Sequence, residues 1–306
     1  MPIDRAVLAK LASLELKAKY IVEGFVTGMH RSPFKGFSVE FAQHRGYVAG
    51  DDLKHLDWKV WGRSGRYMIK QYEAETNLVA HVLMDGSKSM GYAGSTAYNG
   101  MSKLDYAKLC AAAISHLIIE QSDAAALGII GDGLEEYVKR SSSKAHMPRL
   151  IDKLEKLKPS PETRIGQALS DFSTRTRRKG IVFVISDLFD DRETVAKALR
   201  RIRHEGHEVV VLHIMDHDEL DFPFDGMVRF EGLEGGQEAL CHPRSVRATY
   251  LKEVESFLTH TEATCRGAGI DYFRLDTRTP VDVGLSAYLL KREHLASSGA
   301  AGSAPR

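Results

Sequence analysis

One stretch decides the fold of this chain: Leu78-Val-Ala-His-Val-Leu-Met84-Asp85-Gly86-Ser87-Lys88-Ser89, in which a nearly continuous apolar run ends in a polar turn. A short apolar run of this kind predicts a strand that is buried on both faces. Similar runs cover residues 124–130, 181–185 and 208–214, and the segments between them show helical periodicity. This alternation predicts an α/β fold with a doubly wound, mostly parallel sheet of the Rossmann-like type.

The 306 residues divide into four predicted parts. They are an N-terminal helix at 1–30, a small β-rich module at 31–76, the α/β domain with a C-terminal helix at 77–292, and a disordered tail at 293–306. Asp4 can cap the first helix. In the module, alternating residues at 37–41 and the segments 57–61 and 67–72 are interpreted as strands. The tail is rich in Ser, Gly and Ala, which indicates disorder.

Composition favours a soluble globular protein. The net charge is +1 and 43% of the residues are hydrophobic, so no overall basic field points to nucleic acid. No apolar stretch approaches the ~20 residues that a membrane helix needs, and charges interrupt the N-terminus where a signal peptide is apolar. Cys110, Cys241 and Cys265 are widely spaced and form neither a zinc nor a disulfide pattern. We therefore expect a cytoplasmic protein without a membrane span.

Five small oxygen-bearing side chains follow predicted strands or precede a predicted helix. Asp85, Ser87 and Ser89 come directly after the first buried strand, and their spacing of two directs all three side chains the same way in an extended turn. Asp187 follows the strand at 181–185, and Thr163 precedes the helix that begins near Ile165. Because ligands of open α/β sheets bind at the carboxyl ends of the strands, these side chains are candidates for one site.

The chemistry of these five side chains favours a hard cation. Two carboxylates and three hydroxyls suit Mg²⁺, or alternatively Mn²⁺ or Ca²⁺, rather than zinc or copper. Ser87, Ser89 and Thr163 can bind the ion directly, while Asp85 and Asp187 can act through water. Because two carboxylates roughly cancel the charge of the ion, a carboxylate from a partner protein can complete its coordination without repulsion.

The motif resembles the metal-ion-dependent adhesion site of von Willebrand factor A domains, which combines Asp-x-Ser-x-Ser with a later threonine and a later aspartate. A second resemblance spans roughly residues 30 to 290 and is to the bacterial family called domain of unknown function 58. It rests on the segments Gly36-Phe-Ser-Val-Glu40-Phe, Arg45-Gly-Tyr47, Gly50-Asp51-Asp52, Leu56-Asp57-Trp58 and Lys70-Gln-Tyr72-Glu73-Ala-Glu75. This resemblance implies a MoxR-type AAA+ ATPase as partner, a chaperone-like or assembly role, and no established catalytic activity.

Other interpretations of the same residues remain open. The two aspartates can be ordinary loop residues, Thr163 can be a helix cap, and the site can be vestigial. A Mg²⁺- or Mn²⁺-dependent phosphoester hydrolase would use the same ion as a Lewis acid, with His213 or Asp216 as the base. We favour an interaction protein over an enzyme, because two carboxylates are few for two-metal chemistry.

Two further clusters are weaker candidates. The segment His213-Ile-Met-Asp216-His217-Asp218-Glu219 could bind a metal, but we expect a charged loop at the ligand-binding edge. Trp58 and Trp61 lie among basic residues, a composition that can bind single-stranded nucleic acid. Nearby acidic residues weaken the basic field, so we expect no nucleic acid as partner.

Overall fold

The computed structural model describes residues 13–26, 40–48, 56–73, 78–160, 163–176, 178–233 and 238–301. The chain separates into two compact units, one made of Met1–Pro33 with Val79–Arg306 and the other of Phe34–Leu78. Each unit is described by itself. The proposed cap at Asp4 and the alternation at 37–39 lie outside the described residues.

The described residues of the smaller unit form two strands and one helix. Strand β1 (Glu40–Gly46) pairs antiparallel with β2 (Met68–Glu73), and α3 (Trp58–Ser64) precedes β2 in the chain. The prediction of a strand at 57–61 is therefore wrong. The side chain of Asp57 accepts hydrogen bonds from the backbone N–H groups of Lys59 and Val60, and Gly65 ends the helix in the left-handed region. Capping at both ends outweighs the strand-like alternation of apolar residues.

The larger unit is built on a six-stranded sheet, which confirms the predicted α/β fold. The strands lie in the order β10-β7-β6-β3-β4-β5. Their bounds are β3 Val79–Asp85, β4 Ala124–Gly131, β5 Gly133–Ser141, β6 Ile181–Ser186, β7 Glu208–Met215 and β10 Asp271–Asp276. All neighbours are parallel except β4 and β5. All residues of β3 and β6 are buried, as expected for strands covered on both faces.

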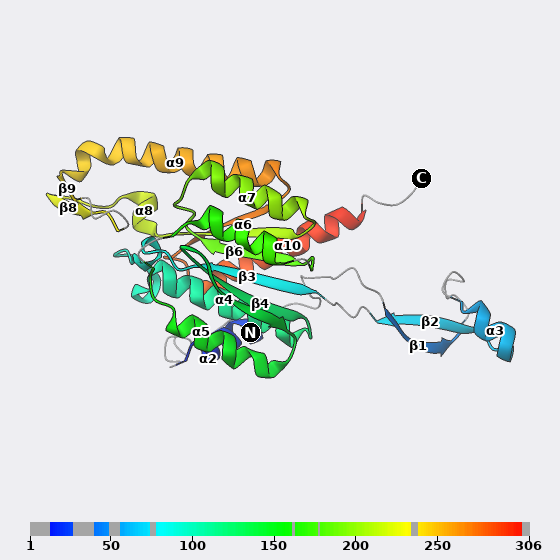
Figure 1. Ribbon diagram of the computed structural model, residues 1–306. Coiled ribbons are helices and arrows are strands. Elements are labelled where there is room, and N and C mark those ends of the chain that lie inside the picture. Colours follow the sequence, from blue (N-terminus) through cyan, green and yellow to red (C-terminus); the bar gives the residue numbers. More distant parts are fainter. Residues whose placement is uncertain are drawn as a thin grey trace. The chain divides into compact units, whose positions relative to one another are not determined.

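Two layers of helices cover the sheet (Figure 1). The helices of this unit are α2 Leu14–Val26, α4 Lys103–Glu120, α5 Met147–Lys156, α6 Ile165–Arg175, α7 Arg192–His204, α8 His217–Asp221, α9 Pro243–Gly267 and α10 Val281–Ala301, with short 3-10 turns at Ser89–Gly91, Tyr98–Gly100 and Lys144–His146. Helices α2, α5 and α10 contact α4 on one face, whereas α6, α7 and α9 pack together on the other. Helix α4 is the most deeply buried of them, and most of its side chains face the core.

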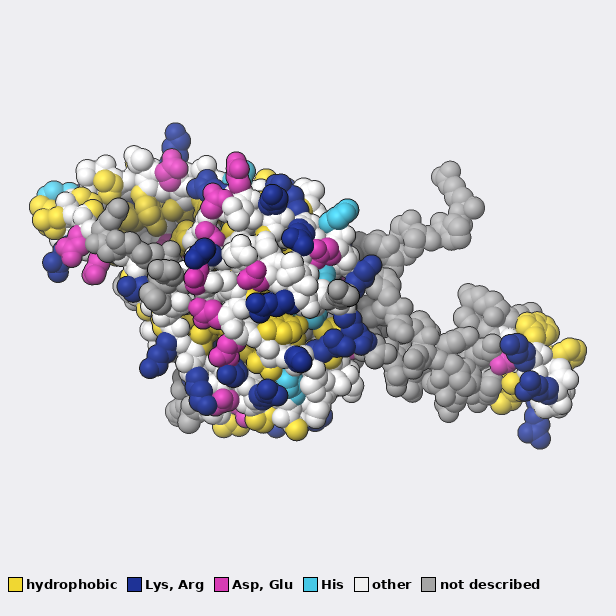
Figure 2. Space-filling view, in the orientation of Figure 1, with side chains coloured by type: hydrophobic (Ala, Val, Ile, Leu, Met, Phe, Trp, Pro, Cys, Tyr) yellow, Lys and Arg dark blue, Asp and Glu magenta, His cyan; other side chains and the backbone are white. Residues whose placement is uncertain are grey.

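The hairpin before α9 and the length of α10 differ from the sequence-based predictions for the larger unit. A hairpin of β8 (Val228–Glu231) and β9 (Glu238–Cys241) precedes α9 and was not predicted. Hydrophobic side chains gather over this hairpin in Figure 2, where Met227 and Leu240 are exposed. Helix α10 continues to Ala301, beyond residue 293 where the predicted tail begins. Within the described part of the chain, no helix is long and apolar enough to span a membrane.

Candidate metal centre

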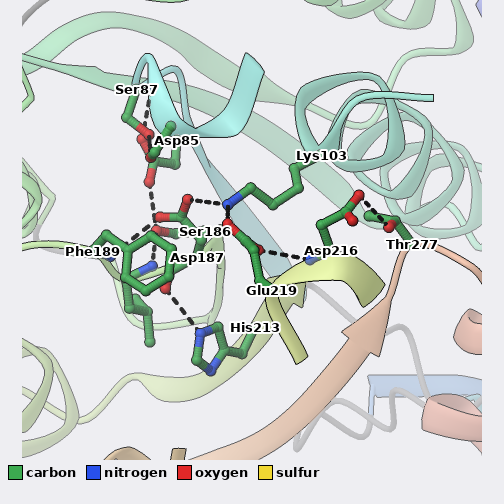
Figure 3. A network of polar contacts seen from close by, with 12 residues as sticks. Asp85, Ser87, Lys103, Ser186, Asp187, Phe189, His213, Asp216, Glu219 and Thr277 are labelled. Atoms are coloured by element: carbon green, nitrogen blue, oxygen red, sulfur yellow. Dashed lines mark hydrogen bonds and ion pairs between the residues drawn. The ribbon is translucent and has the colours of Figure 1, made fainter. Parts of the chain in front are cut away.

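The turn after β3 holds the first three candidate residues in one ordered arrangement, of which Figure 3 shows Asp85 and Ser87. Asp85 is completely buried, and one of its carboxylate oxygens accepts a hydrogen bond of 2.8 Å from the backbone N–H of Ser87. Its other oxygen accepts one of 2.5 Å from the hydroxyl of Ser186. The hydroxyl oxygens of Ser87 and Ser89 lie 2.9 Å apart. The structure therefore places a buried carboxylate below a pair of adjacent hydroxyls.

Backbone hydrogen bonds bring the loop that carries Thr163 against the same turn. Ser160 forms a parallel bridge with Ser87, and its N–H donates to the carbonyl of Gly86 at 2.6 Å. The N–H of Arg164 donates to the carbonyl of Gly131 at the end of β4. Ser160 and Arg164, which lie on either side of Thr163, are thus held beside the polar turn and the adjacent strand end.

Thr163 does not cap α6, contrary to one interpretation of its position. Arg164 occupies the cap position without a side-chain cap, and the N–H of Gly166 donates instead to the carboxylate of Asp190. The Thr163 hydroxyl oxygen is buried and has no hydrogen-bond partner among the described residues. A buried hydroxyl without a partner costs free energy, which a cation at this position would recover.

Asp187 leaves the neighbouring strand β6 and is also completely buried. One carboxylate oxygen accepts a hydrogen bond of 3.2 Å from the N–H of Phe189, and the other accepts one of 2.8 Å from the ammonium of Lys103. Burial, with the negative charge of Asp187, raises the pKa of Asp85 to about 7. Asp187 is therefore close enough to oppose the ionisation of Asp85.

Lys103 is a member of this network that was not predicted. Its side chain is completely buried, although it is the first residue of α4. Its ammonium also donates to the carboxylate of Glu219 at 2.6 Å and lies 4.9 Å from the centroid of the Phe189 ring. Burial alone would lower the pKa of Lys103, but Asp187 and Glu219 raise it above its usual value. The one available signal was its spacing of four from Ala107 and seven from Cys110, which places it on the buried face of α4.

The acidic and histidine-rich segment after β7 forms a different structure. His213 is buried, and its Nε2 donates to the carbonyl of Asp187 while its Nδ1 accepts from the hydroxyl of Tyr272. Burial lowers the pKa of His213 to about 4, so the ring is neutral. Asp216 and Asp218 accept hydrogen bonds from other loops. Among the residues that the structure describes, no three His, Cys, Asp or Glu side chains are grouped so that they could hold a metal ion.

The five predicted residues nevertheless fit a divalent cation of the Mg²⁺ type. Such a site would draw on the three hydroxyls of Ser87, Ser89 and Thr163 as its direct ligands. Asp85 and Asp187 would supply two negative charges from the layer beneath. The orphaned hydroxyl of Thr163 is the structural observation that supports this fit.

A base for hydrolysis is not evident in the same network. Both ring nitrogens of His213 have partners, and the residue is completely buried. The carboxylate of Asp216 accepts from the N–H of Gly94, the N–H of Asp218 and the hydroxyl of Thr277. Both proposed bases are thus buried and already take part in hydrogen bonds with other residues of the chain.

Comparisons with known proteins place this chain near one family of proteins. The family model described as "Protein of unknown function DUF58" matches residues 43–257. The uncharacterized protein Rv1480 of Mycobacterium tuberculosis is 24% identical over 279 residues, which cover 90% of this chain and 86% of that protein.

Two solved structures match part of this chain at low identity. BatB from Bacteroides thetaiotaomicron, a conserved hypothetical protein, gives a TM-score of 0.46 at 18% identity and covers 71% of this chain and 99% of its own. The SpRpn10 VWA domain gives a TM-score of 0.38 at 13% identity and covers 70% of this chain and 94% of its own.

Proposed function

This chain belongs to the DUF58 family, whose function is unknown, and from that starting point we propose that it is a divalent-metal-dependent protein-interaction module. The ion would be held by the hydroxyls of Ser87, Ser89 and Thr163, with Asp85 and Asp187 as negative charges behind them. The observation that carries the proposal is the buried hydroxyl of Thr163, which has no hydrogen-bond partner among the described residues and lies three residues after Ser160, which forms a bridge with Ser87.

Mg²⁺ is the ion that this ligand set suits best, with Mn²⁺ and Ca²⁺ as alternatives. The site offers only oxygen atoms, which hard cations prefer, and Mg²⁺ commonly keeps part of its hydration shell. An open coordination position can then receive a carboxylate from an acidic side chain of another protein. The resemblance to the family suggests a MoxR-type AAA+ ATPase as that protein and a chaperone-like or assembly role.

The metal part of the proposal is tested by titration calorimetry with MgCl₂ and MnCl₂ on the full chain. We expect binding to the wild-type protein, loss of binding in Asp85→Ala, and clear weakening in Thr163→Ala. Thr174→Ala is the matched control, because Thr174 is an exposed threonine whose hydroxyl donates to a carbonyl within α6. Equal binding by Thr163→Ala and Thr174→Ala would show that the orphaned hydroxyl does not hold the ion.

The partner is tested by pull-down with a purified MoxR-type ATPase in Mg²⁺, in EDTA, and with the Asp85→Ala variant. Retention in Mg²⁺ that is lost in EDTA and in the variant supports a metal-bridged contact. Retention under all three conditions would exclude that type of contact.

A metal-dependent phosphoester hydrolase is the second candidate, and it has less support because His213 and Asp216 are committed to other partners. A screen of generic phosphodiesters and phosphomonoesters with Mg²⁺ or Mn²⁺ is the direct test. Turnover that requires the metal and disappears in Asp187→Ala would favour the enzyme.

A further inference from the structure

The ammonium of Lys103 joins two carboxylates from different parts of the fold. It donates to Asp187, at the end of β6, and to Glu219, in α8 (Figure 3). The Lys103 side chain is completely buried, and those of Asp187 and Glu219 are 1% and 16% exposed, so little water screens these charges. A buried lysine is costly unless it is paired, and here the pairing is with two negative groups at once.

Asp187 therefore has a cation beside it that belongs to the chain itself. One of its oxygens faces the ammonium of Lys103, and the other accepts from the N–H of Phe189. A divalent ion that uses the negative charge of Asp187 must share it with Lys103 and must tolerate a like charge close by. In a buried site this repulsion is strong, because the effective dielectric constant is low.

Glu219 acts on the same ammonium from a different part of the fold, helix α8. One of its oxygens accepts from Lys103, and the other accepts from the N–H of Asp216, which fixes the side chain at the start of α8. A fixed negative charge at this position draws the ammonium toward α8 and offsets part of its field at Asp187. Lys103 and Glu219 should thus have opposite effects on any cation that binds near Asp187.

We propose that Lys103 is a built-in competitor of the divalent ion for Asp187, and that Glu219 moderates this competition. The inference rests on the proposed metal site and adds how the affinity of that site is set. Lys103 is a positioning residue in this scheme, since it binds neither the ion nor the partner. Because Glu219 belongs to α8, a partner that moves α8 would change the affinity of the site for metal.

The test measures Mg²⁺ binding by titration calorimetry in the wild-type protein, Lys103→Met, Glu219→Gln and Lys108→Met. Lys108 is the matched control, because it lies on α4 as well and its ammonium donates to the carbonyl of Leu157. We expect Lys103→Met to bind Mg²⁺ at least about tenfold more tightly than wild type and Glu219→Gln to bind severalfold more weakly. Lys108→Met should bind as the wild type does.

Thermal unfolding provides a second measurement on the same proteins. Without metal, Lys103→Met leaves two largely buried carboxylates without their cation, so its melting temperature should fall by about 5 °C or more. Saturating Mg²⁺ should raise the melting temperature of Lys103→Met by more than it raises that of the wild-type protein. If Lys103→Met does not fold at all, Glu219→Gln still tests the proposal through the predicted weakening of Mg²⁺ binding.

Failure of this inference is separable from failure of the proposed metal site. If the wild-type protein binds Mg²⁺ but Lys103→Met binds it no more tightly, or Glu219→Gln binds it no more weakly, the competition is refuted. The proposed metal site is not refuted by that result. Binding by Lys103→Met alone supports the competition and refutes metal dependence of the wild-type protein. Absence of binding in both proteins overturns both proposals, because a freed Asp187 should then attract the ion.

Discussion

Two pairs of buried aspartates lie at the same edge of the sheet, and their surroundings differ. Asp85 and Asp187 follow β3 and β6, whereas Asp216 and Asp218 follow β7, and all four are at most 1% exposed. Asp216 and Asp218 accept hydrogen bonds from the loop at 94–96, and Asp216 also accepts from Thr277. Asp216 and Asp218 thus hold the loop at 94–96 and Thr277 against the turn after β7 by hydrogen bonds.

The first pair has a different set of neighbours. Beside Asp85 lie two adjacent serine hydroxyls, and the loop that carries the unpartnered Thr163 hydroxyl is fixed against the same turn. The number of buried carboxylates at a sheet edge thus does not identify a metal site. What distinguishes the two pairs is whether nearby oxygen atoms remain available after the internal hydrogen bonds are made.

The largest effect that this comparison predicts is on stability, at the second pair. Asp216→Ala removes the acceptor for the N–H groups of Gly94 and Asp218 and for the hydroxyl of Thr277. We expect a loss of about 3 kcal/mol in the free energy of unfolding, because three donors lose their partner. Urea denaturation measures this loss, and Asp221→Ala, at an exposed position of the same helix, is the control.

Gly94 provides an independent check on the same contact. A Cβ atom at position 94 would collide with the carboxylates of Asp216 and Asp218. The loop therefore approaches these carboxylates more closely than a residue with a side chain at this position would allow. Gly94→Ala should therefore destabilise the protein as Asp216→Ala does. Stability near that of wild type in both variants would mean that the loop is not fastened there.

At the first pair we expect a loss of metal binding with little loss of stability. Asp85→Asn keeps the shape of the side chain and removes a buried charge that Asp187 opposes. Its free energy of unfolding without metal should stay within about 1 kcal/mol of wild type, since relief of repulsion offsets a weaker hydrogen bond. The rise in melting temperature with Mg²⁺ should disappear. A strongly destabilised Asp85→Asn that still responds to Mg²⁺ would reverse the roles of the two pairs.

Much of this site could be predicted because its residues are adjacent in sequence to strong strand signals. The fully apolar character of β3 and β6 located their ends, and with them Asp85 and Asp187. Lys103 could not be found in this way, because its partner Asp187 lies 84 residues further along the chain. Its spacing from Ala107 and Cys110 places it on the buried face of α4, but only the packing shows which carboxylates its ammonium meets.

The misassigned and unpredicted elements have equally local causes. In α3 the apolar residues Trp58, Val60 and Trp61 suggest a strand. The Asp57 side chain, however, caps the segment and stabilises it as a helix. The hairpin of β8 and β9 consists of four-residue strands with mostly exposed residues, so it has no apolar pattern to recognise.

A smaller effect is expected in the pH dependence of metal binding. Without metal the pKa of Asp85 is raised to about 7 by burial and by Asp187. A metal site needs the ionised carboxylate, so protons compete with the ion below that pH. Mg²⁺ affinity measured by calorimetry should fall by about tenfold between pH 8 and pH 6. An affinity that is constant over this range would place Asp85 outside the site.

The smallest expected effect is on how stability itself changes with pH, because Asp85 acts in the opposite direction to the buried histidines, of which His81 and His213 both have a pKa lowered to about 4. The pKa of His81 in β3 is lowered to about 4 by burial, so its contribution is full above its ordinary pKa of 6.5 and is lost as the pH falls toward 4. The pKa of Asp85 is raised from 3.8 to about 7, so its contribution is full at low pH and is lost as the pH rises toward 7. Between pH 4 and 6.5 the contributions of Asp85 and of the histidines partly cancel in the wild-type protein.

Asp85→Asn removes one side of this cancellation. Its stability without metal should fall more steeply than that of wild type when the pH is lowered from 6.5 to 4.5, and urea denaturation at several pH values measures the slope. His81→Phe removes part of the other side and should change the slope in the opposite direction. Parallel curves of stability against pH for all three proteins would show that Asp85 is already ionised at low pH. The electrostatic repulsion between Asp85 and Asp187, which distinguishes this pair from Asp216 and Asp218, would then be absent.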